Sequence, residues 1–141
     1  MAEVDAELTH AVRENGGCYH VNIARKNRID HVRVEGVELY NPREDADRQA
    51  IIEAISEADE LATCLPSVAF FDTGNETSVA RLISAGLAKR RAAVPAIIYA
   101  AENHNHAAEI LLKCLQKYTA PEALDQIQIL NTVIGKMSGV I

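Results

Sequence analysis

The residues with the clearest chemical potential form one short polar run, Glu102-Asn103-His104-Asn105-His106. The run follows residues 96–101, an apolar stretch without alternation that is expected to be a strand buried on both faces. In open α/β sheets, ligands bind beyond the carboxyl ends of the strands. A side-chain amide at such an end can both donate and accept hydrogen bonds. The run therefore predicts a ligand site that includes Glu102 and Asn103, unless Asn103 only caps the following helix.

Metal binding is the other chemistry that this part of the chain suggests. His104 and His106 form an H-x-H pair, which could reach one metal ion from a strand. Positions two apart on a helix do not face each other, and we expect His106 to be helical already. The pattern therefore favours a solvated helix start, and no metal site is predicted. Asp72, Asn75 and Glu76 lack the spacing of a calcium loop, so we expect a surface loop there.

The elements that must position these residues alternate between helices and strands. Apolar stripes predict helices that end at Asn15-Gly16-Gly17 or cover residues 46–57, 79–87 and 107–118. Strands are expected at residues 60–65, 96–101 and 126–133. Strands separated by helices are typical of a parallel sheet with right-handed crossovers.

Two alternating segments upstream, residues 19–23 and 31–40, predict an antiparallel hairpin. In the second segment the apolar residues stand at even positions, Val32 and Val34, before Glu35-Gly36 and at odd positions, Val37 and Leu39, after it. One extra residue at a glycine is the pattern of a β-bulge. The predicted fold class is therefore α/β, an incomplete Rossmann-like doubly wound sheet with an antiparallel hairpin. The 7 glycines nowhere form G-x-G-x-x-G, the phosphate-binding loop of dinucleotide-binding sheets.

Length and composition narrow the class of protein. The 141 residues fit one domain, and a net charge of −6 argues against a broad nucleic-acid footprint or attraction to anionic membranes. No stretch approaches the roughly 18 apolar residues of a membrane span, and the acidic N-terminus lacks the features of a signal peptide. Cys18, Cys64 and Cys114 form no CxxC pair, which indicates reduced thiols in a cytoplasmic protein.

Several short motifs follow one another in an order that resembles a known family. A G-L-x-K-R motif appears at residues 86–90, and an [ED]-N turn follows the strand at residues 96–101. Residues 131–137 are similar to N-[ST]-x-V-D-R-I, and residues 1–5 resemble the end of a second Rossmann strand. Together these motifs resemble the N-terminal domain of the mannitol dehydrogenase family over essentially the whole chain.

The resemblance implies that residues 1–141 are a partial dinucleotide-binding domain of an NAD-dependent enzyme acting on a sugar alcohol or sugar alcohol phosphate. The family's first strand, its glycine-rich loop and its first helix would precede the chain, and its C-terminal helical domain, with a catalytic lysine in a K-x4-N-x2-H pattern, would follow it. Glu3 would accept hydrogen bonds from the adenosine ribose, which favours NAD over NADP. Residues lining the cofactor cleft would be Leu65, Pro66, Ser67 and Glu102. Asn103 would orient the reacting hydroxyl group.

Two departures from the family pattern leave another class of protein open. Gly135-Lys136 stands where the family has Asp-Arg, and the loop at residues 67–76 is longer than in the mannitol-phosphate members. The alternative is a non-catalytic α/β module that binds a small ligand or a partner. If the first strand is missing, the sheet has an exposed edge, and we expect the chain to self-associate through it.

Overall fold

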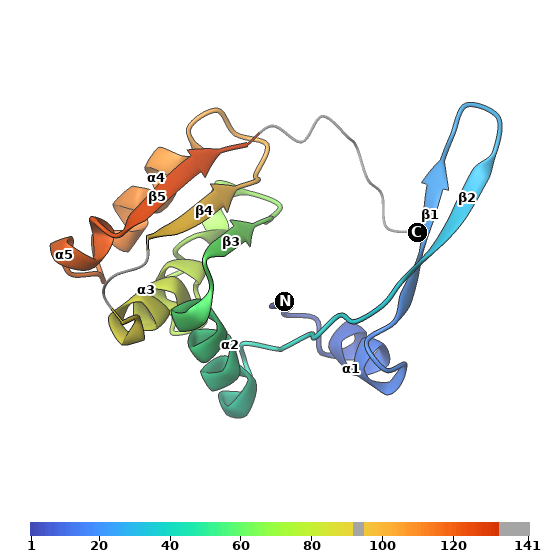
Figure 1. The fold of residues 1–141 in the computed structure, drawn as a ribbon, viewed down its shortest axis with the longest axis horizontal. Coiled ribbons are helices and arrows are strands. Elements are labelled where there is room, and N and C mark those ends of the chain that lie inside the picture. The colour runs from blue at the N-terminus through green and yellow to red at the C-terminus, as the bar shows by residue number, and fades with distance from the viewer. Residues whose placement is uncertain (92–94, 133–141) are drawn as a thin grey trace. The chain divides into compact units, whose positions relative to one another are not determined.

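A computed structural model describes residues 1–91 and 95–132 of the chain (Figure 1). The chain divides into two compact units, Met1–Ile51 and Ile52–Ile141, with the boundary inside helix α2. The elements are α1 (Ala6–Glu14), β1 (Tyr19–Ala24), β2 (Ile29–Val34), α2 (Asp45–Glu57), β3 (Glu60–Thr63), the 3-10 turn η1 (Val68–Phe70), α3 (Val79–Lys89), β4 (Ala96–Ala100), α4 (Ala107–Leu115), α5 (Pro121–Leu124) and β5 (Ile127–Asn131).

The second unit is built on a parallel sheet in the order β3-β4-β5. Helix α3 connects β3 to β4, helix α4 connects β4 to β5, and the two helices contact each other (Figure 1). The central strand β4 alternates between buried and half-buried residues, and Ala96, Ile98 and Ala100 are fully buried. The predicted α/β class, with a parallel sheet and a separate antiparallel hairpin, is therefore confirmed.

The core of the second unit is closely packed around the helices. The largest fully buried side chains are Phe71, Ile98, Leu111 and Leu115. Helix α3 approaches α2 at Gly86, where an added Cβ would lie only 2.4 Å from Cγ2 of Ile55. The glycine therefore sets the distance between these two helices.

The first unit begins with helix α1 and its two caps. The Asp5 side chain accepts hydrogen bonds from the first-turn amides, which is typical of an N-cap. Gly16 and Gly17 follow the helix with φ of 64° and 73°, the left-handed conformation expected at a helix end. The predicted end of this helix is confirmed.

The hairpin β1-β2 is shorter than predicted, because β2 ends at Val34. Tyr19 lies opposite Val34, so an unbroken register would place Gly17 opposite Gly36. The carbonyl of Gly17 instead accepts the amide of Val37, and Gly36 has a φ of 73°. The extra residue predicted at Gly36 is therefore present, but it follows the strand instead of interrupting it.

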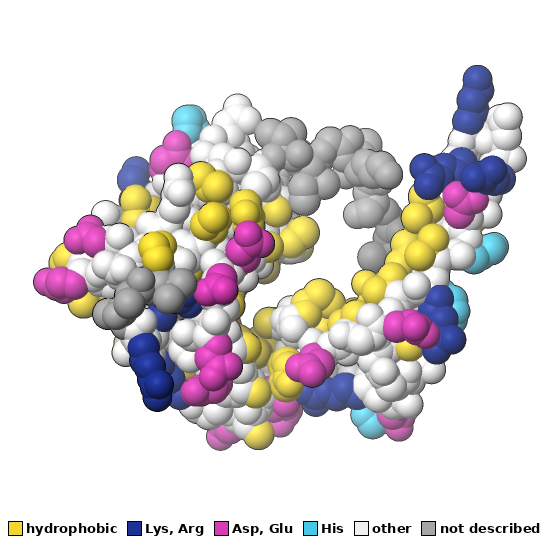
Figure 2. Space-filling model, viewed as in Figure 1, with side chains coloured by type: hydrophobic (Ala, Val, Ile, Leu, Met, Phe, Trp, Pro, Cys, Tyr) yellow, Lys and Arg dark blue, Asp and Glu magenta, His cyan; other side chains and the backbone are white. Residues whose placement is uncertain are grey.

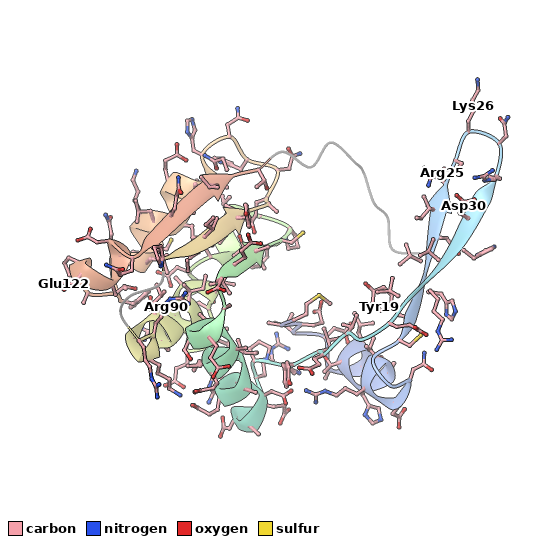
Figure 3. All side chains as sticks on the ribbon, viewed as in Figure 1. Tyr19, Arg25, Lys26, Asp30, Arg90 and Glu122 are labelled. Carbon is pink, nitrogen blue, oxygen red and sulfur yellow. The ribbon has the colours of Figure 1, made fainter. Side chains whose placement is uncertain are left out.

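The side chains of the hairpin sort into apolar and charged regions. Apolar side chains run along it, and Lys and Arg gather at its tip (Figure 2). At the tip, Asp30 forms ion pairs with Arg25 at 2.9 Å and Arg28 at 2.6 Å (Figure 3).

Across the described residues, no helix is long and apolar enough to cross a membrane.

Candidate functional site at the carboxyl edge of the sheet

The three parallel strands end at Thr63, Ala100 and Asn131, so their carboxyl ends share one edge of the sheet. Five of the predicted site residues follow two of these ends: Leu65, Pro66 and Ser67 come after β3, and Glu102 and Asn103 come after β4. We call this region the carboxyl edge. It corresponds to the place where ligands bind in open α/β sheets.

Glu3, the sixth predicted site residue, belongs to the first unit. Its carboxylate accepts the amide of Asp5 at 3.0 Å, and its own amide donates to the carbonyl of Tyr40 at 2.9 Å. Ala2 and Tyr40 form an isolated parallel bridge beside it. Within its unit, Glu3 therefore lies in an extended segment immediately before helix α1.

Glu102 is buried at the carboxyl edge, with 3% of its surface exposed. One carboxylate oxygen accepts the hydroxyl of Thr63 at 3.0 Å, and the other accepts the backbone amide of Leu65 at 2.9 Å. The side chain therefore ties the end of β4 to the segment that follows β3. Sequence reasoning did not find Thr63, since nothing local marks a threonine at a strand end as the partner of a glutamate 39 residues away.

Asn103 is exposed and has no side-chain partner among the described residues. The N-cap of helix α4 is His106, with φ −123°, so the alternative that Asn103 caps this helix is wrong. The expectation that His106 is already helical is also wrong. The amide of His104 donates to the carbonyl of Glu102 at 2.7 Å, which turns the chain directly after β4.

Asn131, at the end of β5, caps helix α4 from a neighbouring strand. Its side-chain oxygen accepts the amide of Ala108 at 2.8 Å, and its side-chain nitrogen donates to Glu109 at 3.0 Å. The bond from Asn131 is the main cause that lowers the pKa of the Glu109 carboxyl, followed by the bond from that residue's own amide. His106, the N-cap residue itself, makes no side-chain cap bond.

The two histidines of the H-x-H pair are exposed, and their ring centroids are 6.2 Å apart. Nδ1 of His104 accepts the amide of His106 at 3.1 Å, and Nδ1 of His106 lies 3.5 Å from Glu109. In the part of the chain that the structure describes, no group of three or more His, Cys, Asp or Glu side chains could hold a metal ion.

The loop at residues 67–76 is anchored through Asp72. Its carboxylate accepts hydrogen bonds from Lys117 at 2.9 Å, from the hydroxyl of Tyr118 at 3.1 Å and from the amide of Gly74 at 3.1 Å. The bond from Lys117 is the main cause that lowers the pKa of Asp72. Phe71 in this loop is fully buried, whereas the neighbouring Phe70 is 50% exposed.

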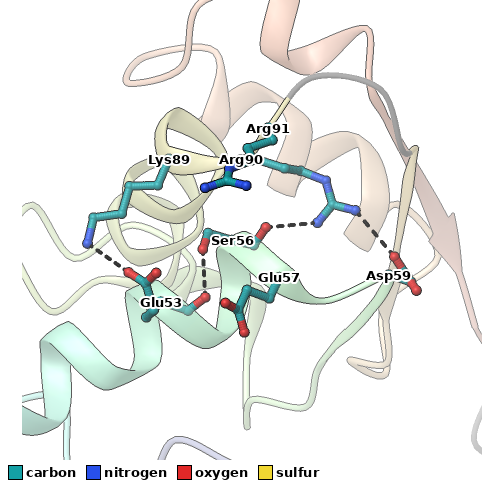
Figure 4. Close-up of a pocket in the computed structure, with 7 residues that line it drawn as sticks. All are labelled: Glu53, Ser56, Glu57, Asp59, Lys89, Arg90 and Arg91. Carbon is teal, nitrogen blue, oxygen red and sulfur yellow. Dashed lines mark hydrogen bonds and ion pairs between the residues drawn. The ribbon is translucent and has the colours of Figure 1, made fainter.

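A separate hollow of about 510 Å³ lies where helices α2 and α3 end (Figure 4). It is at the other end of the sheet from the carboxyl edge, because β3 begins there. Lys89 pairs with Glu53 at 3.1 Å, and the buried Arg90 lies 3.6 Å from Asp59. The lining residues are Glu53, Ser56, Glu57, Asp59, Lys89, Arg90 and Arg91.

The described residues do not fit a complete site for NAD. A dinucleotide pyrophosphate binds where a glycine-rich turn begins a helix. The consecutive glycines of this chain, Gly16 and Gly17, end helix α1 instead. No protein-family model matches the chain, and a comparison with curated proteins finds no match.

Proposed function

We propose that the chain is part of an NAD-dependent oxidoreductase that acts on a sugar alcohol or a sugar alcohol phosphate. The observation that supports this most is the position of Asn103, an exposed amide three residues after the end of the central strand, without a protein partner among the described residues. The sheet order β3-β4-β5 adds support, since one half of a doubly wound sheet has neighbours in consecutive order.

In this proposal the chain supplies residues beside the reaction. NAD carries the hydride chemistry in such enzymes. The Asn103 amide orients the substrate oxygen and donates to it as negative charge develops. Leu65, Pro66 and Ser67, which follow β3 at the same edge of the sheet, would line the cleft beside the cofactor.

The chain by itself is expected to be inactive. It contains no G-x-G-x-x-G, and none of its lysines begins a K-x4-N-x2-H pattern that would supply a general base. General-base catalysis alone is worth on the order of 10² to 10⁴ in rate. Purified chain, incubated with NAD and a panel of polyols, should show no NADH formation above buffer. Turnover by this chain would refute the partial-enzyme proposal.

The coding sequence on either side of this reading frame is the first test of the enzyme. An in-frame glycine-rich motif upstream and K-x4-N-x2-H downstream are expected. In the enzyme that includes these parts, Asn103→Ala should lower kcat by roughly 10² to 10³ with little change in NAD affinity. His104→Ala is the control and should change kcat little. Unchanged turnover in Asn103→Ala would remove Asn103 from the site.

The alternative function, a non-catalytic module that binds a small ligand, is favoured by the hollow at the ends of α2 and α3. Glu57 and Arg91 line it without partners among the described residues (Figure 4). Flanking sequence without the two enzyme motifs would support this alternative. A thermal-shift screen with small polar metabolites should then find a stabilising ligand, and Glu57→Gln should weaken its binding.

Self-association through strand β3 is a further part of the proposal. Asp59 and Thr63 accept backbone hydrogen bonds from β4, and backbone groups alternate along a strand. The backbone groups of Glu60 and Ala62 therefore point away from β4, toward an edge without a partner strand in the described chain. Such an edge invites pairing with another chain. Analytical ultracentrifugation should detect oligomers, and a clean monomer would count against this expectation.

A further inference from the structure

The connection from β4 to α4 is tied to both neighbouring strands of the sheet. At its start, Glu102 accepts hydrogen bonds from Thr63, at the end of β3, and from Leu65 beyond it. At its far end, Asn131 of β5 accepts the amide of Ala108 in the first turn of α4. The exposed residues 103–106 therefore lie between two side-chain braces that come from opposite sides.

The burial of Glu102 separates its role from that of its neighbour. Only 3% of its surface is exposed, and each carboxylate oxygen already accepts a hydrogen bond at 3.0 Å or less. Asn103, the next residue, is exposed. A ligand at the carboxyl edge can reach the Asn103 amide, whereas the Glu102 carboxylate faces the protein.

The brace from Asn131 replaces a cap that helix α4 lacks. The N-cap residue, His106, makes no side-chain bond to the first-turn amides. The Asn131 oxygen occupies that acceptor position for Ala108, and its nitrogen donates to the Glu109 carboxylate at 3.0 Å. Both polar atoms of one side chain therefore fix the start of the helix relative to β5.

We propose that Glu102 and Asn131 are positioning residues that hold the exposed Asn103–His106 segment in place from both sides, and that neither contacts a ligand directly. The functional meaning of this bracing rests on the proposed role of Asn103. The bracing itself can be measured on the 141-residue chain without any enzyme assay.

Amide hydrogen exchange followed by NMR tests the first brace. Glu102→Met removes both acceptors and should lower the protection of the Leu65 amide about tenfold or more, as expected for a lost bond to a charged acceptor. Glu102→Gln keeps one carbonyl acceptor and should restore most of this protection. Thr63→Val, which removes one donor, is the milder variant if Glu102→Met does not fold. Glu122→Gln, at an exposed position of α5, is the matched control.

The second brace is tested in the same way. Asn131→Ala should lower the protection of the Ala108 amide about fivefold, the usual effect of losing a cap. Gln128→Ala, at an exposed position of the same strand, is the control and should leave Ala108 unchanged. In both brace variants, the cross-peaks of Asn103 should shift or broaden.

The set of amides that lose protection against hydrogen exchange distinguishes local positioning of residues 103–106 from general stabilisation of the fold. Local positioning predicts that the amide of Ile98, in the core of β4, keeps its protection. A parallel loss at Ile98 and Leu65 would show that Glu102 only stabilises the fold, and would overturn the proposal. Unchanged exchange at Leu65 in Glu102→Met would overturn it as well. Neither result depends on whether the intact protein oxidises a polyol. Failure of the bracing proposal can therefore be distinguished from failure of the proposed function.

Discussion

The two units of the chain differ in what holds them together. Among residues 1–91 and 95–132, the four largest fully buried side chains all belong to the second unit: Phe71, Ile98, Leu111 and Leu115. Of the exposed large hydrophobic residues in the described part of the chain, the first unit contains most: Met1, Val4, Leu8, Val21, Ile29 and Val32. A two-stranded hairpin without a covering layer is marginally stable by itself. The second unit therefore owes its stability to apolar burial to a larger extent than the first.

Polar contacts have a correspondingly larger part in the first unit. The Arg13 guanidinium donates to the carbonyl of Leu39 and to Asp47, both at 2.7 Å. Asp47 also accepts the amide of Asn41 at 2.7 Å, and this bond is the main cause that lowers the pKa of Asp47. The difference teaches that one chain can combine a packed sheet with a unit that is joined mainly by hydrogen bonds.

The largest expected effect is the loss of a core side chain in the second unit. Leu111→Ala should reduce the free energy of unfolding by about 2–5 kcal/mol, because it removes a fully buried side chain and leaves a cavity. Val32→Ala, at a position 39% exposed in the hairpin, should cost less than about 1 kcal/mol. Urea unfolding followed by NMR signals from each unit measures both. Equal costs would remove the contrast between the units.

A second pair of variants compares packing with backbone conformation. Gly86→Ala should destabilise the second unit by about 1–3 kcal/mol, because the new methyl group would overlap the Ile55 side chain. Gly16→Ala meets no atom within 4 Å, but its φ of 64° disfavours alanine. Its cost should be about 1 kcal/mol and confined to the first unit. Thermal unfolding of the two variants gives the comparison, and a stabilised Gly86→Ala protein would contradict the close approach of α2 and α3.

The third prediction concerns the pH dependence of the second unit. The pKa of Asp72 is lowered by folding, chiefly through the bond from Lys117. A lowered pKa contributes stability that is present above the unfolded value, near 3.8, and is lost as the pH falls through the folded value. The stability difference between the native chain and Asp72→Asn should therefore shrink below about pH 4. A stability difference that stays unchanged at low pH would rule out this contribution.

The smallest effect is expected at the hollow between the ends of α2 and α3. Lys89 and Glu53 are about half exposed, so their ion pair is screened by solvent. Lys89→Ala should change the free energy of unfolding by less than about 1 kcal/mol, and added salt should reduce even that effect. A larger loss, measured by urea unfolding, would show that this ion pair supports the packing of the two helices.

The sequence predicted the class of fold well because its signals are local. The apolar run of β4 and the stripe of α4 each depend on spacing alone, and both elements are present. The predicted β2 was too long, because its last residues belong to a connection that bonds to Gly17. The predicted strand at residues 126–133 covers β5, and its last residue lies outside the described chain.

The candidate site was predicted in part for a related reason. The carboxyl ends of parallel strands share an edge, so the placement of Glu102 and Asn103 followed from the sheet alone, whereas Leu65 was predicted through the family resemblance. The bonds of Glu102 and Asn131 could not be predicted, since each joins residues far apart in the sequence. Which polar side chain faces the protein and which faces solvent is decided by these bonds, and not by residue type.

The cap on α4 also has a consequence for the order of folding. The side-chain oxygen of Asn131 accepts the backbone amide of Ala108, which lies 23 residues earlier in the chain. Until β5 has joined the sheet, the first turn of α4 has no side-chain acceptor at this amide, and the helix end is expected to fray. Helix α4 and strand β5 should therefore become ordered in one cooperative step. During synthesis, the chain would have to emerge beyond Asn131 before the segment carrying Asn103 becomes rigid.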